Sequence, residues 1–538
     1  MTDMRLLTAA EMRGLETAAI ASGEATGPDM MEQAGAGVVQ AVLSRWPELR
    51  DGPRRAVVLC GPGNNGGDGY VIARLLAQQY WDVSVFGMGE GDAMPPDAVA
   101  NRRRWEDIGE VAPLEQASAD GADLIVDAVF GTGLSRGFAP PDRVGGLFHN
   151  LFADGFWGHG RELAPYVVAV DVPSGLDADS GKVLWTDSQW CGDIAAHLTV
   201  TFQQPKLGHV LADGPAQCGD LEVVDIGLKD RSQGIPLARL PDPLLAEPSL
   251  LKGVLEAHKF DHGHALVLTG GMGRTGAARL AARGALRIGA GLVSLGAPGS
   301  AMMECAAQIS GLMLRRCGDA DGLRAALEDD RINALCIGPG FGIGETQIAI
   351  VQTALEIAAN RGARLSVVLD ADALSNFSGQ PDEIVPHLAD VGVITPHGGE
   401  FARVFPDLAA RMAERATHGP AYSKVDAARE AAERAQCVVV FKGADTVIAG
   451  PDGEVAVHAA AYGRAAPWLA TAGSGDVLAG IITGLLARGF EPFLAAQAGV
   501  FLHVEAARSF GPGLVAEDLP DLLPKVLRRI EIDADLKK

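Results

Sequence analysis

Two motifs rich in glycine and aspartate lie far apart in the chain, and each could bind an anion beside a carboxylate. The first is Gly61–Gly69 (GPGNNGGDG) and the second is Thr471–Asp476 (TAGSGD). In each, a glycine-rich turn borders a predicted helix, where free backbone N–H groups can meet a phosphate. Because the motifs are too far apart to form one local site, they predict two catalytic domains that both handle phosphate-bearing ligands.

The first motif contains a GxGxxG turn directly after the apolar run Val57–Cys60. A dinucleotide site of the Rossmann type also needs an acidic residue about 20 positions further on, at the end of the next strand. Here the next predicted strand is Val83–Phe86, and no acid follows it before Glu90. The alternative is a turn that only lets a helix pack tightly on a strand, although such a turn does not need the asparagines and the aspartate between the glycines.

Two further predicted strands end in polar loops. Asp127 precedes the loop Gly131–Gly137 (GTGLSRG), and Asp171 precedes Ser174 in VDVPSGLD. Because ligands bind at the carboxyl ends of parallel strands, we expect all three loops to meet in one crevice. The oxygen atoms of Asn65, Asp127 and Ser174 are hard ligands that suit a cation such as K⁺ or Mg²⁺.

Together with Lys206 in TFQQPKLG, these motifs resemble the NAD(P)H-hydrate epimerase family over roughly residues 5–228. The resemblance implies that Asp171 and Lys206 exchange protons while C6 of a hydrated nicotinamide inverts, since ring opening or an iminium route needs a poised acid or base. It also implies K⁺ bound by Asn65, Asp127 and Ser174. A protein that keeps this scaffold only for binding is the alternative. The implied substrate-binding residues are Asn64, Asn65, Gly66, Gly67, Asp68, Gly131, Thr132, Gly133, Leu134, Ser135, Arg136, Gly137 and Asp171.

The second motif precedes an apolar helical run from Gly475 to Arg488. Asp476 could deprotonate a hydroxyl group, or orient it, for attack on a terminal phosphate. An aspartate that merely stabilises the start of the helix is the alternative. The chain contains no GxxxxGK[ST] sequence, which argues against a P-loop enzyme.

Other predicted strand ends carry DADAL from Asp370, TPHGGE from Thr395 and KGADT from Lys442. With GSGDVL from Gly473, they resemble the ADP/ATP-dependent NAD(P)H-hydrate dehydratases of the ribokinase-like superfamily over roughly residues 250–525. Because hydroxide is a poor leaving group, a phosphoryl group is first placed on the hydrate; the resemblance implies Asp476 as the base and Mg²⁺ on the phosphates of ADP or ATP. The implied contacts to the hydrate are Ala277, Gly340, His397 and Asp476, and those to the nucleotide are Lys442, Gly443, Ala444, Asp445, Thr446 and Gly475.

Short apolar runs alternate with helical patterns in both halves of the chain, which predicts two α/β domains with parallel strands covered on both faces. By resemblance, residues 1–228 form a Rossmann-like three-layer domain and residues 251–538 a ribokinase-like one, joined by a proline-rich linker at 229–250. The predicted strands are Ala56–Cys60, Val83–Phe86, Leu124–Val129, Val167–Val172, Leu198–Phe202, Leu221–Ile226, Ala265–Thr269, Leu292–Leu295, Ala334–Ile337, Ser366–Leu369, Gly392–Thr395 and Val438–Phe441. Predicted helices include one capped by Thr8 with Glu11, one from Pro28 towards Trp46, and Thr346–Asn360, Ser423–Gln436, Gly475–Arg488 and Pro492–Phe510.

The composition restricts the possible partners and the compartment. A formal net charge of −23 argues against general binding to nucleic acids and against docking on anionic membranes. No apolar run approaches the ~20 residues of a membrane span, and no signal-peptide pattern follows Met1. Seven scattered cysteines without a CxxC pair indicate reduced thiols in a cytoplasmic protein. The apolar α/β surfaces lead us to expect a homo-oligomer.

The two resemblances name one repair pathway, in which the first domain interconverts R and S hydrates of NADH or NADPH and the second dehydrates the S form with ADP or ATP. A ribokinase-like kinase for a small molecule, carrying an N-terminal binding module, is the leading alternative. A cofactor-sensing or scaffold protein without turnover is the other. The sequence leaves the preference between ADP and ATP, and between the two hydrates, open.

Overall fold

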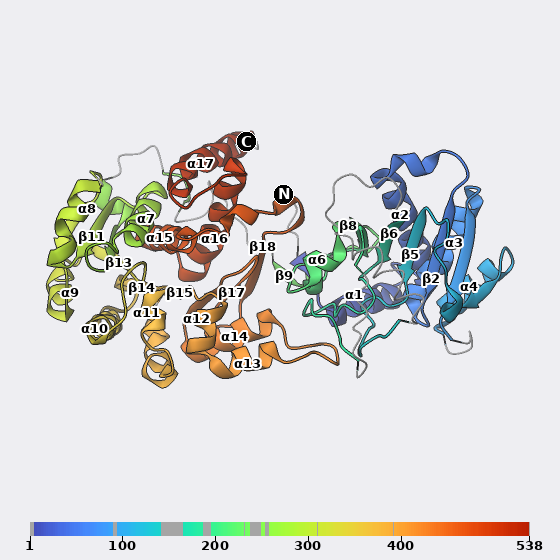
Figure 1. Cartoon of the computed structure of the whole chain (residues 1–538), viewed down its shortest axis with the longest axis horizontal. Helices are drawn as coiled ribbons and strands as arrows, with labels where there is room; N and C mark the ends of the chain where they lie inside the picture. Colours follow the sequence, from blue (N-terminus) through green and yellow to red (C-terminus); the bar gives the residue numbers. More distant parts are fainter. Residues whose placement is uncertain are drawn as a thin grey trace. The chain divides into compact units, whose positions relative to one another are not determined.

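The computed structural model describes residues 5–89, 94–140, 165–186, 195–230, 232–236, 249–252, 258–308, 310–390 and 392–536 (Figure 1). The chain divides into two compact units. Unit 1 comprises Met1–Pro236 together with Glu414–Lys424, and unit 2 comprises Leu237–Ala413 together with Val425–Lys538. Within the predicted linker, residues 231 and 237–248 lie outside the described residues. The domain bounds drawn from the sequence therefore stay a prediction.

Unit 1 is built on a seven-stranded sheet with the order β4-β3-β2-β5-β6-β7-β8, in which every neighbouring pair is parallel. From β2 the chain first moves outward through β3 and β4, and then returns to the other side of β2 at β5. The switch point between β2 and β5 is where doubly wound sheets bind ligands. The strands are β2 (Arg55–Cys60), β3 (Asp82–Gly87), β4 (Val111–Pro113), β5 (Leu124–Ala128), β6 (Tyr166–Val170), β7 (Leu198–Phe202) and β8 (Asp220–Val224).

Alternate residues of these strands enter two separate apolar clusters, so the sheet is buried on both faces. Val58 and Val126 pack in one cluster with Ile72, while Val57 and Ile125 pack in the other. This explains why the central strands β2, β5 and β6 are apolar along most of their length, as the sequence predicted, whereas the edge strand β8 is largely exposed. The described helices of unit 1 are α1 (Ala9–Ser22), α2 (Gly27–Arg45), α3 (Asn64–Gln78), α4 (Pro96–Glu106) and α6 (Gly214–Cys218), and the short strands β1 (Arg5–Leu6) and β9 (Ile235–Pro236) pair with each other.

Unit 2 contains a nine-stranded sheet with the order β12-β11-β10-β13-β14-β15-β16-β17-β18. It is parallel from β12 to β16, and β17 and β18 add an antiparallel edge. The strands are β10 (His264–Leu268), β11 (Leu292–Ala297), β12 (Met313–Arg316), β13 (Ile332–Ile337), β14 (Ser366–Leu369), β15 (Val393–Ile394), β16 (Val438–Phe441), β17 (Asp445–Ala449) and β18 (Val455–Ala459). Its helices are α7 (Gly276–Arg287), α8 (Met302–Gln308), α9 (Ala320–Ala326), α10 (Glu345–Arg361), α11 (Asp372–Ser375), α12 (Gly398–Val404), α13 (Pro406–Ala413), α14 (Lys424–Ala435), α15 (Ser474–Ala487), α16 (Pro492–Phe510) and α17 (Leu519–Asp535).

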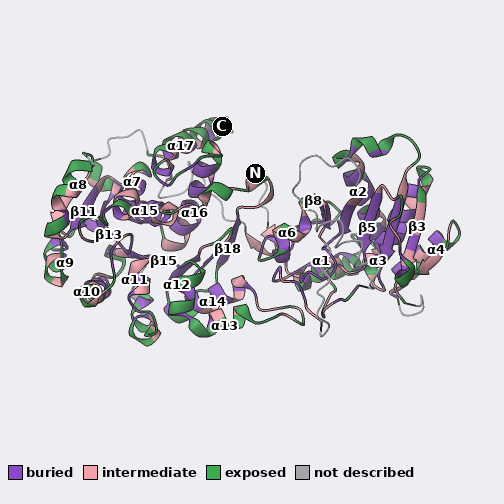
Figure 2. Ribbon diagram, viewed as in Figure 1, coloured by how far each residue is buried: buried purple, intermediate pink, exposed green. Residues whose placement is uncertain are grey.

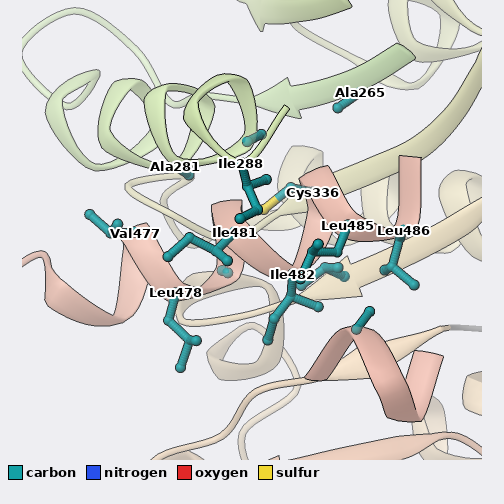
Figure 3. Close-up of a cluster of buried hydrophobic side chains, with 14 of the residues drawn as sticks. Ala265, Ala281, Ile288, Cys336, Val477, Leu478, Ile481, Ile482, Leu485 and Leu486 are labelled. Carbon is teal, nitrogen blue, oxygen red and sulfur yellow. The ribbon is translucent and has the colours of Figure 1, made fainter. Parts of the chain in front are cut away.

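Helix α15 is the buried centre of unit 2 and carries the second motif at its start. Ile481 and Leu485 are fully buried in the large core of this unit, beside Ile288 at the end of α7 (Figure 3). A methyl group added at Gly480 would lie 2.0 Å from the carbonyl oxygen of Ala281, so the two helices pack at backbone contact. Because burial of each large aliphatic side chain contributes about 1.5–3 kcal/mol, this packing holds the start of α15 firmly in place.

Figure 2 shows the central strands of both units as buried and the outer surfaces of the helices as exposed. None of the helices in the described part of the chain combines the length and hydropathy needed to span a membrane. The predicted α/β fold class, with parallel strands and covering helices, is confirmed.

Candidate active sites

In unit 1, the loops after β2 and β5 meet at the switch point of the sheet. The N–H group of Gly61 donates to the carbonyl oxygen of Ala128 at 3.0 Å, and a Cβ atom on Gly61 would lie only 1.7 Å from the carbonyl oxygen of Val129. Gly61 is therefore required for this contact between loops, as the packing alternative proposed. Asn64, by contrast, is exposed at the first position of α3 and is free to face a ligand.

A buried ion pair between Asp171 and Lys206 lies at the same edge of the sheet. Nζ of Lys206 lies 3.0 Å from Oδ1 of Asp171. Lys206 is 1% exposed and Asp171 is 8% exposed. The ammonium group also donates to Oγ1 of Thr201 at 2.8 Å and to the carbonyl oxygen of Phe202 at 3.0 Å. Oγ1 of Thr201 in turn donates to Oδ1 of Asp171 at 2.9 Å. All three N–H bonds of the ammonium group thus have acceptors, and Lys206 is fixed.

Two features hold the Asp171 backbone in position. Asp171 has a φ of 67°, in the left-handed region that is uncommon for residues other than glycine. Nδ1 of His209 accepts the backbone N–H of Lys206 at 2.8 Å, so Nε2 carries the proton and donates to the carbonyl oxygen of Asp171 at 2.8 Å. Burial and the nearby Lys206 charge lower the pKa of His209 to about 4, which keeps this imidazole neutral.

The charges around Asp171 separate the protonation states of three carboxyl groups. Burial raises the pKa of Asp171, but the Lys206 charge and the hydrogen bonds to the carboxylate outweigh it, so the pKa lies below its ordinary value. Burial and the negative charge of Asp171 raise the pKa of Glu16 and raise that of Asp68 well above its ordinary value. Asp171 is thus the carboxylate of this group that stays ionised, with two acidic neighbours that hold protons more tightly.

The residues expected to bind a cation also gather here. Asp127 is completely buried and accepts the backbone N–H of Ser174 at 2.8 Å and its hydroxyl at 2.6 Å. Burial raises the pKa of Asp127 to about 6, although the hydrogen bonds from Ser174 lower it. Nδ2 of Asn65 is buried and has no hydrogen-bond partner among the described residues. A half-turn of this amide would present its oxygen there instead, which is the atom that a cation takes.

A buried carboxylate without a cationic partner in its hydrogen-bond set fits a bound monovalent cation. Asn65 and Asp171 both lie against Gly131, since a Cβ atom there would be 3.0 Å and 2.9 Å from their respective side-chain oxygens. Within the described ranges, no group of three or more His, Cys, Asp and Glu side chains is arranged to hold a metal ion.

The loop Gly131–Gly137 covers the ion pair. The N–H group of Thr132 donates to Oδ2 of Asp171 at 3.1 Å, and the guanidinium group of Arg13 donates to the carbonyl oxygen of Thr132 at 3.3 Å. Gly133, Ser135 and Arg136 are exposed, and Thr132, Leu134 and Gly137 are half-buried. Of the predicted residues of unit 1, the structure thus brings Gly131, Thr132 and Lys206 to Asp171, with Asn65 beside Gly131. It brings Asp127 to Ser174.

In unit 2, the start of α15 forms a candidate anion site. Gly473 caps the helix with a φ of 92°, and Nζ of Lys442 lies 3.3 Å from the position that a Cβ atom on Gly475 would take. The carbonyl oxygen of Ser474 accepts a hydrogen bond from Nε2 of the buried His503 at 2.9 Å. The positive end of a helix dipole and an ammonium group therefore lie together at the half-buried start of α15.

Carboxylates surround this ammonium group. Nζ of Lys442 lies 2.6 Å from Oδ1 of Asp370 and 3.7 Å from Oε2 of Glu400. Burial lowers the pKa of Lys442, but the charges of Asp370 and Glu400 outweigh this and raise it. Burial and the charge of Asp370 raise the pKa of Asp476 to about 7, against the lowering effect of Lys442. Asp476 therefore exchanges a proton near neutral pH, which a helix-stabilising aspartate does not require.

Two of the predicted substrate contacts in unit 2 are neighbours, and a third is joined to the carboxylate cluster. A Cβ atom on Gly340 would lie 3.3 Å from Cβ of Ala277, with Gly340 at a φ of 60°. His397 is exposed, and its Nε2 lies 3.3 Å from Oε1 of Glu400. Its backbone N–H donates to Oε2 of the same glutamate at 2.8 Å. No distance joins Ala277 and Gly340 directly to Asp476.

The predicted nucleotide segment Lys442–Thr446 forms the turn between β16 and β17. Gly443 and Ala444 are exposed, whereas the hydroxyl group of Thr446 donates back to the carbonyl oxygen of Gly443 at 2.8 Å. Asp445 and Thr446 begin the antiparallel strand β17. The segment is therefore a tight turn that presents Lys442 on one side and backbone groups on the other.

Sequence reasoning assigned no role to Thr201, His209 or Glu16. A signal existed for two of them: Thr201 is one of two threonines in the otherwise apolar strand β7, and Glu16 is half-buried on α1, one turn after the buried Met12. His209 carried no signal, because its role depends on a turn that brings its ring beneath Asp171.

The fold and these sites define an α/β enzyme with one unit of a doubly wound type and one of a ribokinase-like type. Family models match both, "YjeF-related protein N-terminus" over residues 27–208 and "NAD(P)H-hydrate dehydratase" over residues 265–529. The chain is 34% identical over 559 residues to the bifunctional NAD(P)H-hydrate repair enzyme Nnr of Moorella thermoacetica, covering 99% of this chain and 98% of that protein. The chain belongs to the family of bifunctional NAD(P)H-hydrate repair enzymes.

The chain is also similar to proteins that cover one or both of its units. The repair enzyme of Escherichia coli is 32% identical, over 93% of this chain and 89% of that protein. An NAD(P)H-hydrate epimerase of Rhodobacter capsulatus is 46% identical over 208 residues, which cover 38% of this chain and 91% of that protein. The ADP/ATP-dependent NAD(P)H-hydrate dehydratase of Bacillus subtilis, crystallised with ATP and Mg²⁺, is 28% identical, with a TM-score of 0.41 over 52% of this chain and 94% of that chain.

Proposed function

We propose that unit 1 epimerises hydrated NADH and NADPH at Asp171, and that unit 2 dehydrates the S epimer at Asp476. The observation that carries the proposal for unit 1 is the buried Asp171–Lys206 pair beneath the loop Gly131–Gly137. Family membership supports the pairing of the two activities in one chain.

In unit 1, Asp171 exchanges the proton and Lys206 sets its charge. Oδ1 of Asp171 is held by Lys206 and Thr201, so Oδ2, on the side of the Thr132 N–H group, is the oxygen that faces the substrate loop. It takes the proton of the C6 hydroxyl as that C–O bond becomes a carbonyl and the C6–N1 bond breaks, and it delivers the proton to N1. Reclosure on the other face of the carbonyl inverts C6.

We assign a K⁺ site to Asn65, Asp127 and Ser174. When bound, the ion would supply a fixed positive charge beside the anionic substrate. The support is chemical: Asp127 is a fully buried carboxylate whose hydrogen bonds come from neutral groups, and an amide atom of Asn65 lacks a partner among the described residues. The implied substrate contacts in Asn64–Asp68 and Gly131–Gly137 are part of the same proposal.

In unit 2, Asp476 accepts the proton of the C6 hydroxyl group. The oxygen of that hydroxyl group attacks the terminal phosphorus of ADP or ATP. AMP or ADP leaves, and a C6 phosphate ester remains. The phosphate then departs with the C6–O bond pair as C5 loses a proton, which restores the C5–C6 double bond. Lys442 and the start of α15 hold the phosphates, and Mg²⁺ bound to the nucleotide would neutralise charge there. Ala277, Gly340 and His397 are proposed hydrate contacts, and Lys442–Thr446 with Gly475 the nucleotide contacts.

A cytoplasmic location and a homo-oligomer are further parts of this proposal. The six cysteines in the described part of the chain are all buried, and none of them is paired with another in a disulfide, which suits a reducing compartment. Sedimentation of the purified protein at several concentrations tests the oligomer.

The decisive experiment incubates the protein with mixed R and S hydrates of NADH in the presence of K⁺, Mg²⁺ and ADP, and follows the return of nicotinamide absorbance. Complete recovery of both epimers supports both activities. Recovery that stops once the S epimer is consumed contradicts the epimerase. Phosphorylated product without restored absorbance, with either ADP or ATP, favours a small-molecule kinase with an N-terminal binding module.

A further inference from the structure

One stretch of unit 1 comes from far along the sequence. Residues Glu414–Lys424 belong to unit 1, although α13 before them and nearly all of α14 after them belong to unit 2. We call this stretch the strap. A division of the chain into consecutive domains would assign the strap to unit 2, so its contacts within unit 1 require a reason of their own.

The strap pairs with the exposed half of the loop over Asp171. Arg136 and His418 form an antiparallel β-bridge. The N–H group of Gly137 donates to the carbonyl oxygen of Thr417 at 3.2 Å, and that of Gly419 donates to the carbonyl oxygen of Ser135 at 3.1 Å. Ser135–Gly137 therefore has a short strand partner, which no neighbour in the sequence supplies.

The strap is also fastened to the segment that follows Asp171. The N–H group of Trp185 donates to the carbonyl oxygen of Ala416 at 2.8 Å, and the guanidinium carbon of Arg415 lies 3.5 Å from the centre of the Trp185 ring. The N–H group of Ala421 donates to Oδ2 of Asp177 at 3.1 Å. Asp177 is 3% exposed, so this hydrogen bond satisfies a buried carboxylate.

The packing between these segments leaves no spare space. A Cβ atom on Gly419 would lie 2.6 Å from Oδ1 of Asp177 and 3.3 Å from the carbonyl oxygen of Leu134. A Cβ atom on Gly137 would lie 2.3 Å from the carbonyl oxygen of Trp185. The strap thus joins the loop over Asp171 to the segment that follows Asp171, through backbone hydrogen bonds on both of its sides.

We propose that the strap is a positioning element of the epimerase site, which fixes Ser135–Gly137 relative to Asp171. This rests on the proposed role of Gly131–Gly137 in binding the hydrate. A loop without the strap would have to order its backbone when substrate binds, and this costs conformational entropy. Misplacement by ~1 Å of groups that hold a substrate can reduce the rate by about 10²-fold. Because the strap orders the loop before the substrate binds, neither the entropy loss nor the misplacement arises.

The test uses the full-length chain with Gly419→Pro and Ala421→Pro combined, since proline removes the N–H groups that bind Ser135 and Asp177. We expect KM for the R hydrate of NADH to rise roughly tenfold with a smaller fall in kcat, because the loop binds before it reacts. Dehydration of the purified S hydrate by the same sample should stay at the level of the wild type. His418→Ala, which changes an exposed side chain and keeps the backbone, is the matched control.

Trypsin provides a readout that does not depend on activity. Arg136 is exposed but held in a β-bridge, so cleavage after it should be slow in the wild type and fast in the double variant. Fast cleavage with an unchanged KM for the R hydrate would overturn the proposal, since the loop would then be free without loss of binding. Slow cleavage would equally overturn it, because the strap would not hold the loop.

A second variant covers failure of the double variant to fold. Arg415→Ala removes the contact with Trp185 and leaves every backbone hydrogen bond of the strap in place. We expect a KM increase of roughly two- to threefold for the R hydrate alone, in line with the loss of one exposed cation–π contact; no increase rejects the strap as a positioning element. Failure of the epimerase proposal itself gives a different result, namely full activity on the R hydrate in Asp171→Asn.

Discussion

Nζ of Lys206 lies 3.0 Å from Oδ1 of Asp171, and both groups are almost completely withdrawn from solvent. The pair is joined by Thr201, whose hydroxyl accepts from the lysine and donates to the aspartate. In such a buried site the ammonium group and the carboxylate stabilise each other, because either charge alone would be strongly unfavourable. The aspartate can therefore lie in an enclosed site and still remain ionised.

Asp171→Asn should abolish epimerisation and leave dehydration intact. The amide cannot take a proton, and the expected loss is about 10²–10⁴-fold for removal of a general acid–base group. The variant also leaves Lys206 buried without its partner, which should destabilise unit 1 by about 3–5 kcal/mol. Urea unfolding and turnover of the separate R and S hydrates measure both effects.

The control for that variant is Asp171→Asn combined with Lys206→Met. Removing both charges should recover much of the stability while epimerisation stays absent. Recovery of activity in the double variant would show that neither group exchanges the proton.

The neutral His209 should make unit 1 less stable in weak acid. Its pKa is lowered from 6.5 to about 4 in the folded protein, so the unfolded chain binds the extra proton first as the pH falls. The contribution is present above pH 6.5 and is lost as the pH falls towards 4. By linkage this amounts to about 2 kcal/mol between pH 7 and pH 5.

Comparison with His209→Gln isolates this effect from those of other buried histidines. A glutamine side chain can accept from the N–H group of Lys206 and donate to the carbonyl oxygen of Asp171, but it does not titrate. The free energy of unfolding of the variant should therefore fall less between pH 7 and pH 5. Equal falls in both proteins would contradict the assignment.

The dehydratase rate should rise with pH through about 7, because Asp476 must be ionised to accept a proton and its pKa is about 7. Glu400 is one of the charges that raise this pKa. Glu400→Gln should therefore move the midpoint of kcat/KM for the S hydrate to lower pH. The measurement is the pH dependence of kcat/KM for both proteins over the neutral range. An unchanged midpoint would show that the ionisation of Asp476 does not determine this pH dependence.

K⁺ should stabilise unit 1 if Asp127 contributes to its site. Binding to the folded state alone adds stability as RT ln(1 + [L]/Kd), which is about 2.7 kcal/mol at a hundredfold excess over Kd. Thermal unfolding in KCl and in an equal concentration of tetramethylammonium chloride compares the two cases without any substrate. The difference should vanish in Asp127→Asn, and a K⁺ effect that persists there would place the ion elsewhere.

Much of the fold could be predicted because the central strands are short, mainly apolar runs that alternate with helical patterns. Leu198–Phe202 and Val438–Phe441 have the bounds that the pattern predicts, and Thr8 with Glu11 forms the expected capping box. Strands β12, β17 and β18 were not predicted, since they lie near or at an edge of the sheet and are short or follow a tight turn. Their neighbours in the sheet, and not their own sequences, decide their structure.

The candidate sites likewise contain residues that could be predicted from the sequence and residues that could not. The polar residues at strand ends were found because their types and positions are local, as for Asp171 and Asp476. The hydrogen bonds of His209 and the pairing of Arg136 with His418 depend on segments that meet only in three dimensions. A single sequence does not show which distant segments contact each other.

The strap also imposes an order on the making of the protein. Synthesis proceeds from the N-terminus at about 5–20 residues per second, so Ser135–Gly137 leaves the ribosome roughly tens of seconds before Gly419 can pair with it. During this interval, Ser135–Gly137 of the nascent chain lacks its strand partner. A molecule whose translation stops between Lys206 and Gly419 should therefore carry an epimerase site whose loop lacks its strand partner.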